Sequence, residues 1–262
     1  MTDQKRHHDE SRRDVAPVAL VTGGAVRVGR AIALVLAAAG HDIVIGYGTS
    51  ADAAEVTRGH IERLGRACLT VRADLTEPAG PDHLVEEARS GFGRLDVVVN
   101  SAASFRSKPL EDVDAAEFDA AMALNVRAPH LVTRAAIDLL RASRGCVVNI
   151  TDLSAFQAWP RYPHHAVSKA ALAHLTRVQA RSYAPEVRVN AIAPGAVLAP
   201  DDWSDERWNA VAEKAALRRT GSPDDVVQAV LYLVSADFVT GHVLPVDGGR
   251  LLGATGPMTD QE

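Results

Sequence analysis

The segment RYPHHAVSK, residues 161–169, holds several side chains that can take part in proton transfer. His165 lies four residues before Lys169, which opens a helix-forming run, and Tyr162 lies seven residues before it. An imidazole and a phenol both serve enzymes as proton donors, and a nearby ammonium changes how readily each holds its proton. The segment therefore predicts a site for acid–base chemistry, with His165 and Tyr162 as alternative proton donors.

Asp152 is a further candidate for the same chemistry. It ends the run GCVVNITD, whose composition is typical of a buried strand. A carboxyl group at the mouth of a buried strand costs free energy unless a partner compensates it. This favours a functional site over the two structural alternatives, a helix cap and a surface loop.

The elements that would position these side chains follow a regular order. Short runs rich in Val and Ile alternate with Ala-rich helical segments such as GRAIALVLAAAG and KAALAHLTRVQARSYA. Strands that are apolar on both faces and alternate with helices form a parallel sheet covered on both sides, with ligands beyond the carboxyl ends of the strands. The expected strands are PVALVT (17–22), HDIVIGY (41–47), ACLTVRAD (67–74), LDVVVNSA (95–102), GCVVNITD (145–152), VRVNAIAP (187–194) and HVLPVDG (242–248).

These patterns predict one doubly wound, Rossmann-like α/β domain with a parallel seven-stranded sheet. The domain spans residues 16–253, between a disordered polar tail at 1–15 and a C-terminal tail at 254–262. No apolar run is long enough to span a bilayer, and the polar opening lacks the apolar centre of a signal peptide, so a cytoplasmic location is expected. Cys68 and Cys146 lie in apolar runs without a C-x-x-C pattern and are expected to be core residues.

Composition narrows the class of partner. The chain has 262 residues, 47% of them hydrophobic, and its 28 basic and 33 acidic residues are mixed along the sequence to give a net charge of −5. Neither nucleic acid nor an anionic membrane is favoured by this balance. Small molecules are the expected partners, and no metal site is expected.

The first expected strand leads into a glycine-containing turn, VTGGAVRVGRAIA (21–33). Gly23 and Gly24 permit a tight turn, and Gly29 lets the following helix pack close to the strand. Free N–H groups at the start of that helix can hold a pyrophosphate. Such a turn is a weak signal by itself, because turns need glycine in any case.

Over residues 18–253 the chain resembles the short-chain dehydrogenase/reductases, and within them the pteridine and dihydromonapterin reductases. Arg27, in the sixth place of the turn motif, is typical of the pterin-reducing branch, and the family's N-N-A-G is loosened here to NSAA. The matching residues are Thr22, Gly23, Arg27 and Gly29 in the turn, Asp74 in ADL, Asn100 to Ala103, Asn125 in LNV, Pro194 and Gly195, and Val246 to Gly249.

The resemblance implies a nicotinamide dinucleotide in the cleft. NAD-specific sites keep an acid after the second strand, whereas IGYGTSAD has none before Asp52. Thr49 and Ser50 could bind a 2′-phosphate, with helix capping as the alternative, and Arg27 could add charge, so NADPH is the expected cofactor. The expected contacts are Thr22, Gly23, Arg27, Val28, Gly29, Tyr47, Thr49, Ser50, Asp74, Leu75, Asn100, Ser101, Ala102, Lys169, Pro194 and Gly195.

Two positions match the pterin branch in particular. Asp152 falls where most of the family has a catalytic Ser and pterin reductases have Asp. Phe105 follows NSAAS, where an aromatic residue of those enzymes stacks on the pterin ring; a place in the core is the alternative. We expect Ser104, Phe105 and Trp203 to contact the substrate, which would be pterin-like or another flat carbonyl or imine.

By the same resemblance, Asn125, Asp152, His165 and Lys169 form the catalytic group, with His165 in the place of the family's Tyr. An ammonium nearby disfavours a protonated imidazole, whereas Asp152 favours it and would set the tautomer. Tyr162 is the second proton-donor candidate, because divergent enoyl-acyl carrier protein reductases use its spacing from the Lys. Loss of reductase chemistry, with a cyclase, a lyase or a non-catalytic nucleotide-binding subunit as the outcome, is the third alternative.

The last part of the chain predicts a flap and an interface. Residues 197–217 are expected to close over the ligand, and Trp203 and Trp208 either wall a pocket or dock on a neighbouring subunit. The final strand, from His242 to Asp247, matches the family strand that commonly builds a tetramer interface. A homo-oligomer, dimer or tetramer, is therefore expected.

Overall fold

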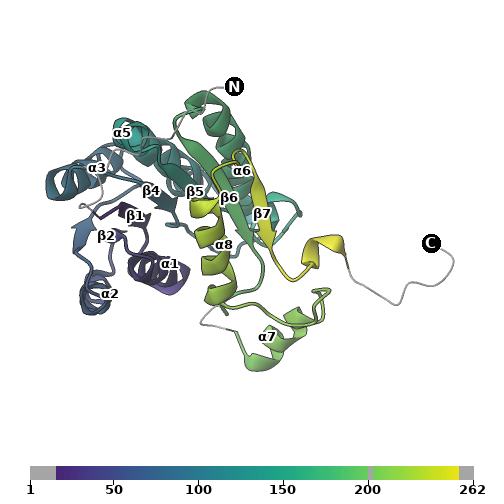
Figure 1. Cartoon of the computed structure of the whole chain (residues 1–262). Helices are drawn as coiled ribbons and strands as arrows, with labels where there is room; N and C mark the ends of the chain where they lie inside the picture. The colour runs from purple at the N-terminus through teal and green to yellow at the C-terminus, as the bar shows by residue number, and fades with distance from the viewer. Residues whose placement is uncertain (1–15, 200–202, 254–262) are drawn as a thin grey trace, which may run out of the picture.

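The structure is a computed structural model that describes residues 16–199 and 203–253, so both expected tails lie outside the described residues (Figure 1). Its centre is a parallel sheet of seven strands in the order β3-β2-β1-β4-β5-β6-β7. The strands are β1 (Val18–Thr22), β2 (Asp42–Tyr47), β3 (Cys68–Arg72), β4 (Val97–Asn100), β5 (Cys146–Ile150), β6 (Arg188–Pro194) and β7 (Val243–Val246). The predicted doubly wound, Rossmann-like domain is confirmed.

Helices cover both faces of the sheet (Figure 1). One layer contains α1, α2 and α8, and the other contains α3, α5 and α6. The described helices are α1 (Arg27–Ala38), α2 (Ala51–Arg63), α3 (Ala79–Phe92), α4 (Ala115–Met122), α5 (Ala128–Ser143), α6 (Pro163–Tyr183), α7 (Asp205–Ala212) and α8 (Pro223–Ser235), with the shorter η2 (Leu110–Asp112), η3 (Ala123–Arg127), η4 (Leu153–Ala155) and η5 (Arg250–Leu252).

Successive side chains of a strand point to opposite faces of the sheet. Because both faces are buried, the strands are continuous apolar runs in the sequence. In β4, Val97 and Val99 pack into the core under α1 and α8, whereas Val98 packs into the core under α3 and α5. Each face of a central strand is therefore buried, as expected for a parallel sheet between two helical layers. None of the described helices is long and apolar enough to cross a membrane.

The carboxyl ends of the central strands meet at one edge of the sheet. Thr22 pairs with Gly46 on one side and Asn100 on the other, and Asn100 pairs with Asn149. Asn100 donates from Nδ2 to Oδ1 of Asn149 at 2.8 Å. Loops that leave these strands therefore start side by side, which brings the glycine turn, NSAAS and Asp152 to the same edge.

The segment between α4 and α5 departs from regular α-helical geometry. The η3 segment is a π-helix that contains Asn125, whose side chain is fully buried. Insertions of this kind re-aim a side chain and are frequent at functional sites. In this chain the Asn125 side chain accepts from the N–H of Ser104 and donates to Ser168 of α6.

Candidate active site

A cleft of about 660 Å³ opens at the carboxyl edge of the sheet. It collects sequence-predicted residues from every strand end between β1 and β6. Those that line it are Gly23, Arg27, Val28, Gly29, Tyr47, Thr49, Ser50, Asp74, Leu75, Ser101, Ala102, Phe105, Asp152, His165, Lys169 and Gly195.

The glycine turn forms one wall of the cleft through its backbone. Gly23 adopts φ +66°, and a Cβ there would lie 3.0 Å from Cα of Ala102. A Cβ on Gly29 would lie 2.2 Å from the carbonyl oxygen of Gly23, closer than any real contact. Arg27 also has a positive φ, +52°, which explains why a glycine is more usual at this place. Its guanidinium reaches across the cleft to the carbonyl of Ala199, at 3.2 Å.

The start of α1 fits the pyrophosphate of a dinucleotide. The N-cap residue is Val26, whose side chain cannot accept a hydrogen bond, and no side chain caps the helix. The first N–H groups of α1 therefore lack a side-chain acceptor, and the residues that carry them line the cleft. An anion bound there would satisfy these groups and interact with the positive end of the helix dipole.

Five predicted residues line neither the cleft nor the pocket beside it: Thr22, Asn100, Ser104, Asn125 and Pro194. Oγ1 of Thr22 accepts the N–H groups of Ser101 and Ala102, at 3.0 and 3.1 Å, and so fixes the loop after β4. Asn100, Asn125 and Pro194 are buried, and none of them lines the cleft. Thr22 and Asn125 hold the loop after β4, Thr22 through Ser101 and Ala102 and Asn125 through the N–H of Ser104.

The far end of the cleft, beyond β2 and β3, is polar. Ser50 is the N-cap residue of α2, but its side chain makes no capping hydrogen bond. Arg72, which the sequence reasoning missed, pairs with Tyr47 across the two strands and lines the same end. The sequence could have indicated Arg72, because it lies at the end of a predicted strand, two residues before Asp74.

Asp74 holds its own loop. Its Oδ1 accepts from the N–H and the hydroxyl of Thr76, at 2.9 and 2.6 Å, and these hydrogen bonds lower the pKa of the carboxyl group. The carboxylate therefore stays ionised and exposed at the rim of the cleft, where the resemblance places an adenine.

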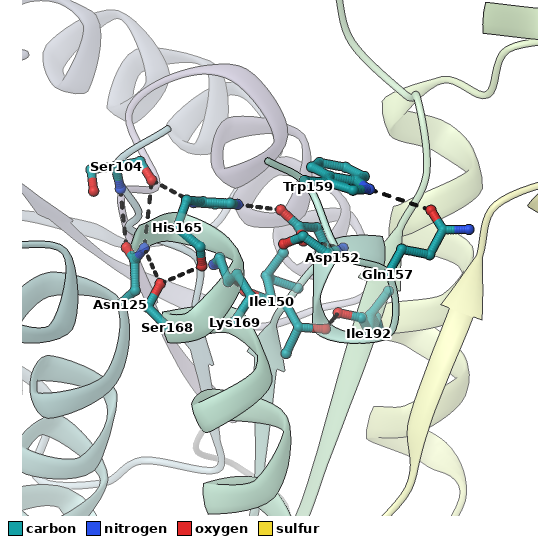
Figure 2. Close-up of polar contacts among 12 residues, drawn as sticks. Ser104, Asn125, Ile150, Asp152, Gln157, Trp159, His165, Ser168, Lys169 and Ile192 are labelled. Carbon is teal, nitrogen blue, oxygen red and sulfur yellow. Dashed lines mark hydrogen bonds and ion pairs between the residues drawn. The ribbon is translucent and has the colours of Figure 1, made fainter. Parts of the chain in front are cut away.

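His165 lies at the opposite end of the cleft, between two oxygen acceptors (Figure 2). Its Nε2 contacts Oδ2 of Asp152, and its Nδ1 lies 2.7 Å from the backbone carbonyl oxygen of Ser104. A carbonyl can only accept, so Nδ1 carries a hydrogen. Nε2 and the Asp152 carboxyl then share one proton, which resides on either the imidazole or the acid.

Charges around Asp152 favour its ionised form. Burial alone would raise the pKa of the carboxyl group, but the hydrogen bond from His165, the charges of His165 and Lys169, and a bond from Ser154 together lower it. The N–H of Ser154 donates to Oδ1 at 2.7 Å. This bond is also the cap of η4, so one oxygen of Asp152 is structural and the other meets the imidazole.

Lys169 is 3% exposed, and its Nζ donates to the carbonyl of Ile150 at 2.8 Å. Burial lowers the pKa of this amine to about 8, while the charge of Asp152 opposes the change. The ammonium thus lies in a low-dielectric environment at the cleft, with few groups to screen it.

A chain of hydrogen bonds holds the other side of His165 (Figure 2). Nδ2 of Asn125 donates to Oγ of Ser168 at 2.9 Å, and that hydroxyl donates to the backbone carbonyl of His165 at 2.7 Å. Oδ1 of Asn125 accepts the N–H of Ser104 at 3.1 Å. Ser168 was missed from the sequence, although its place three residues after His165 on a helix offered the signal.

Tyr162 and Trp203 line a second pocket that adjoins the cleft. The ring of Tyr162 stacks on Phe105, with centroids 4.4 Å apart and planes 11° apart, and Phe105 meets the edge of His165 at 4.9 Å. One face of Phe105 is therefore covered by Tyr162. Trp208 lines the pocket with Trp203, so the structure shows these two residues as a wall.

The adjacent His164 turns away from this site. It is buried and does not line the cleft, and its Nδ1 has no hydrogen-bond partner among the described residues. In the part of the chain that the structure describes, no three His, Cys, Asp or Glu side chains gather in a way that could hold a metal ion.

Known proteins share this fold and much of this sequence. A family model described as enoyl-(acyl carrier protein) reductase matches residues 24–250. An uncharacterized oxidoreductase of Mycobacterium tuberculosis is 38% identical over 240 residues, which cover 88% of this chain and 91% of that protein. The 3-oxoacyl-[acyl-carrier-protein] reductase of Synechocystis is 31% identical over 242 residues, covering 90% and 98%.

Solved structures agree. A short-chain dehydrogenase from Burkholderia cenocepacia in complex with NADP superposes with a TM-score of 0.85 at 33% identity, over 90% of this chain and 98% of that one. The chain belongs to the short-chain dehydrogenase/reductase family, and the expectation of an enzyme of the oxidoreductase class is confirmed.

Proposed function

We propose that this protein is an NADPH-dependent reductase that transfers hydride to a carbonyl or imine carbon of a flat substrate, pterin-like molecules among them. The observation that carries the proposal is the contact of His165 with Asp152 beside Lys169, at the end of a cleft that fits a dinucleotide. A titratable pair partly shielded from water, next to a buried cation, is the arrangement expected of a proton donor.

The polar end of the cleft supports NADPH as the form that binds. Arg72, Thr49 and Ser50 offer a cation and two hydroxyl groups, and the first acid after β2 is Asp52. A guanidinium and hydroxyls suit a 2′-phosphate, whereas a ribose diol is usually met by a carboxylate. The Burkholderia cenocepacia relative, solved with NADP, is consistent with this choice.

The residues of this chain supply the proton that reduction requires. When bound, the reduced nicotinamide supplies the hydride, and the substrate oxygen or nitrogen then needs a proton. Nδ1 of His165 is held by Ser104, so the mobile proton is the one shared with Asp152. The side chain of Asp152 is 18% exposed and that of His165 only 3%. Because its surroundings favour the ionised form of Asp152, the proton is held on Nε2 of His165 and passes to the substrate through the more exposed carboxylate of Asp152.

Lys169 and the hydrogen-bond chain prepare this step. The Lys169 ammonium stabilises the carboxylate that Asp152 becomes after it has given up its proton. Asn125 and Ser168 hold the backbone of Ser104 and His165, which keeps the imidazole between its two acceptors. Because the pair must start protonated, turnover should fall as the pH rises.

The test is NADPH oxidation, followed by nicotinamide absorbance, with a panel of dihydropterins, quinones and aromatic ketones. Asp152→Asn should lower turnover by about 10²–10⁴-fold, because the amide cannot release a proton, while NADPH affinity measured by calorimetry stays near wild type. Failure of dihydropterins alone removes the pterin substrate and leaves the reductase.

A different outcome would overturn the proposal. If the wild-type protein binds NADPH but reduces nothing in the panel, and His165→Tyr gains turnover, the natural chain has given up reduction. A cyclase, a lyase or a non-catalytic subunit then remains. Assembly as a dimer or tetramer and a cytoplasmic location stay predictions, which size-exclusion chromatography with light scattering and cell fractionation would check.

A further inference from the structure

The second pocket, of about 340 Å³, is an aromatic chamber beside the cleft. Five aromatic side chains line it: Phe105, Trp159, Tyr162, Trp203 and Trp208. These include all three tryptophans of the chain. Aromatic walls of this kind suit a flat ring, because offset-stacked and edge-to-face contacts stabilise ring pairs beyond their buried area.

The chamber opens into the cleft where the proton donor lies. Phe105, Gly195 and Leu198 line both spaces. Phe105 lies 4.9 Å from the His165 ring, measured between centroids. A molecule that fills the chamber therefore lies beside the part of the cleft that holds the Asp152–His165 pair.

The charged residues that line the chamber are basic, among those that the structure describes. Arg161, Lys214 and Arg250 line it, and no carboxylate does so among the described lining residues. Arg207 adds a fourth cation at the wall, with its guanidinium carbon 3.8 Å from the centroid of the Trp203 ring. An aromatic space whose charged lining residues, within the described part of the chain, are all basic favours an anionic ligand over a neutral or cationic one.

Arg250 is the cation best placed to bind such an anion. It is half-buried, and its guanidinium carbon lies 5.7 Å from the centroid of the Trp159 ring. Within the described residues its side chain makes no hydrogen bond and no ion pair. Asp247 is near, but its two oxygens accept the N–H groups of Gly249 and Leu251, at 2.9 and 2.8 Å. A partly desolvated guanidinium with open donors is a strong site for a carboxylate.

We infer that the chamber binds the body of the substrate, a flat aromatic ring that carries a carboxylate, with the ring among the tryptophans and the carboxylate on Arg250. The inference rests on the proposed reductase function, because it makes the chamber the substrate side of that site. It narrows the substrate class from flat carbonyls and imines to those that are also anionic.

The test compares two matched probes, trans-cinnamate and cinnamamide. They share the same ring and linker, but the first carries a carboxylate and the second a neutral amide. Quenching of the intrinsic tryptophan fluorescence reads binding directly, because every tryptophan of the chain lines the chamber. We expect the wild-type protein to bind trans-cinnamate about tenfold more tightly than the amide, as a charge-assisted hydrogen bond predicts.

Variants assign the preference to Arg250. Arg250→Gln should abolish the tenfold preference, Arg250→Lys should keep most of it, and Arg141→Gln, an exposed helix position outside the chamber, should leave it unchanged. Unchanged NADPH affinity and thermal unfolding show that each variant is folded. Equal affinity for the two probes in the wild type, or a preference that survives Arg250→Gln, would overturn the inference.

The two proposals fail in different ways. Binding of trans-cinnamate is measured without turnover, so a protein that prefers the anion but never oxidises NADPH contradicts only the proposed reductase activity. A protein that reduces neutral substrates and shows no preference for the anion contradicts only the anionic substrate class.

Discussion

The two halves of the active site differ in whether backbone or side-chain groups form them. The cofactor half is made by backbone: the turn at Gly23 and Gly29, the open N–H groups of α1 and the loop that Thr22 holds. The chemical half is made by side chains, above all Asp152, His165 and the ring of Phe105. The turns of a backbone site tolerate few residues, because an added side chain would collide with backbone. A side-chain site, in contrast, can change its chemistry by one substitution.

This difference explains how the acid–base side chains can vary while the backbone of the cofactor cleft stays the same. His165 lies on α6 and faces the cleft, so a substitution there could change the chemistry of the site without changing the path of the backbone. A side chain at residue 29 would instead collide with backbone that cannot move without shifting α1.

The largest effect should come from His165. His165→Phe removes the group that shares the proton with Asp152, and turnover should fall by about 10²–10⁴-fold while NADPH affinity stays near wild type. Tyr162→Phe keeps the ring that stacks on Phe105 and loses only the hydroxyl, so it should change turnover little. Steady-state kinetics of both variants decide the question. The reverse pattern would move the proton donor to Tyr162.

Gly29→Ala should disrupt the cofactor half of the site, which backbone groups form. The added methyl group would lie 2.2 Å from the carbonyl oxygen of Gly23. The resulting shift of α1 should cost about 3 kcal/mol of stability, together with NADPH affinity. Gly59→Ala is the matched control, because its methyl group lies in α2 with only Arg63 near it, at 3.8 Å, and the change should be slightly stabilising. Denaturant unfolding and calorimetry measure both variants. Normal binding by Gly29→Ala would refute the tight turn.

The buried Lys169 should make the free energy of unfolding depend on pH. Its pKa is 10.5 ordinarily and about 8 in the fold, so between these values the unfolded chain binds a proton that the folded chain lacks. The free energy of unfolding should therefore rise with pH across this window, by at most about 1.4 kcal/mol per unit from this group. Lys169→Met should lose that slope in urea titrations at pH 8, 9 and 10. A variant with the wild-type slope would show that Lys169 is not desolvated.

The smallest effect concerns cofactor choice. Arg72→Gln should weaken NADPH binding by about tenfold and leave NADH binding unchanged, because only the 2′-phosphate needs the cation. Arg63→Gln, an exposed arginine of α2 outside the cleft, is the control. Calorimetric titration with both dinucleotides gives the comparison, and an equal loss for both would place Arg72 away from the phosphate.

The fold could be predicted from the sequence because the patterns that indicate it are local. Each of the seven Val- and Ile-rich runs contains an observed strand, and their alternation with helices leaves few arrangements other than a parallel sheet covered on both sides. The residues at the strand ends follow from the same pattern, since parallel strands present their carboxyl ends at one edge. Thus Asp74, Asp152 and Gly195 could be assigned to the cleft before any coordinates.

The contacts that those residues make could not be predicted from local sequence patterns. Nothing in the sequence states that Nδ1 of His165 meets the carbonyl of Ser104, 61 residues earlier, or that Arg250 lies beside Trp159. Such contacts depend on how loops from different strands are oriented, and the π-helix at Asn125 that fixes one of them has no clear local signal.

The sequence by itself determined the class of fold, the cleft edge and the residue types available for chemistry, because hydrophobic period and turn residues act over a few neighbours. Only the tertiary structure decided which nitrogen of His165 shares a proton, which hydroxyls stand behind the wall, and that three tryptophans and three cations surround one space. These are distances between segments far apart in the chain, and packing of the two helical layers sets them.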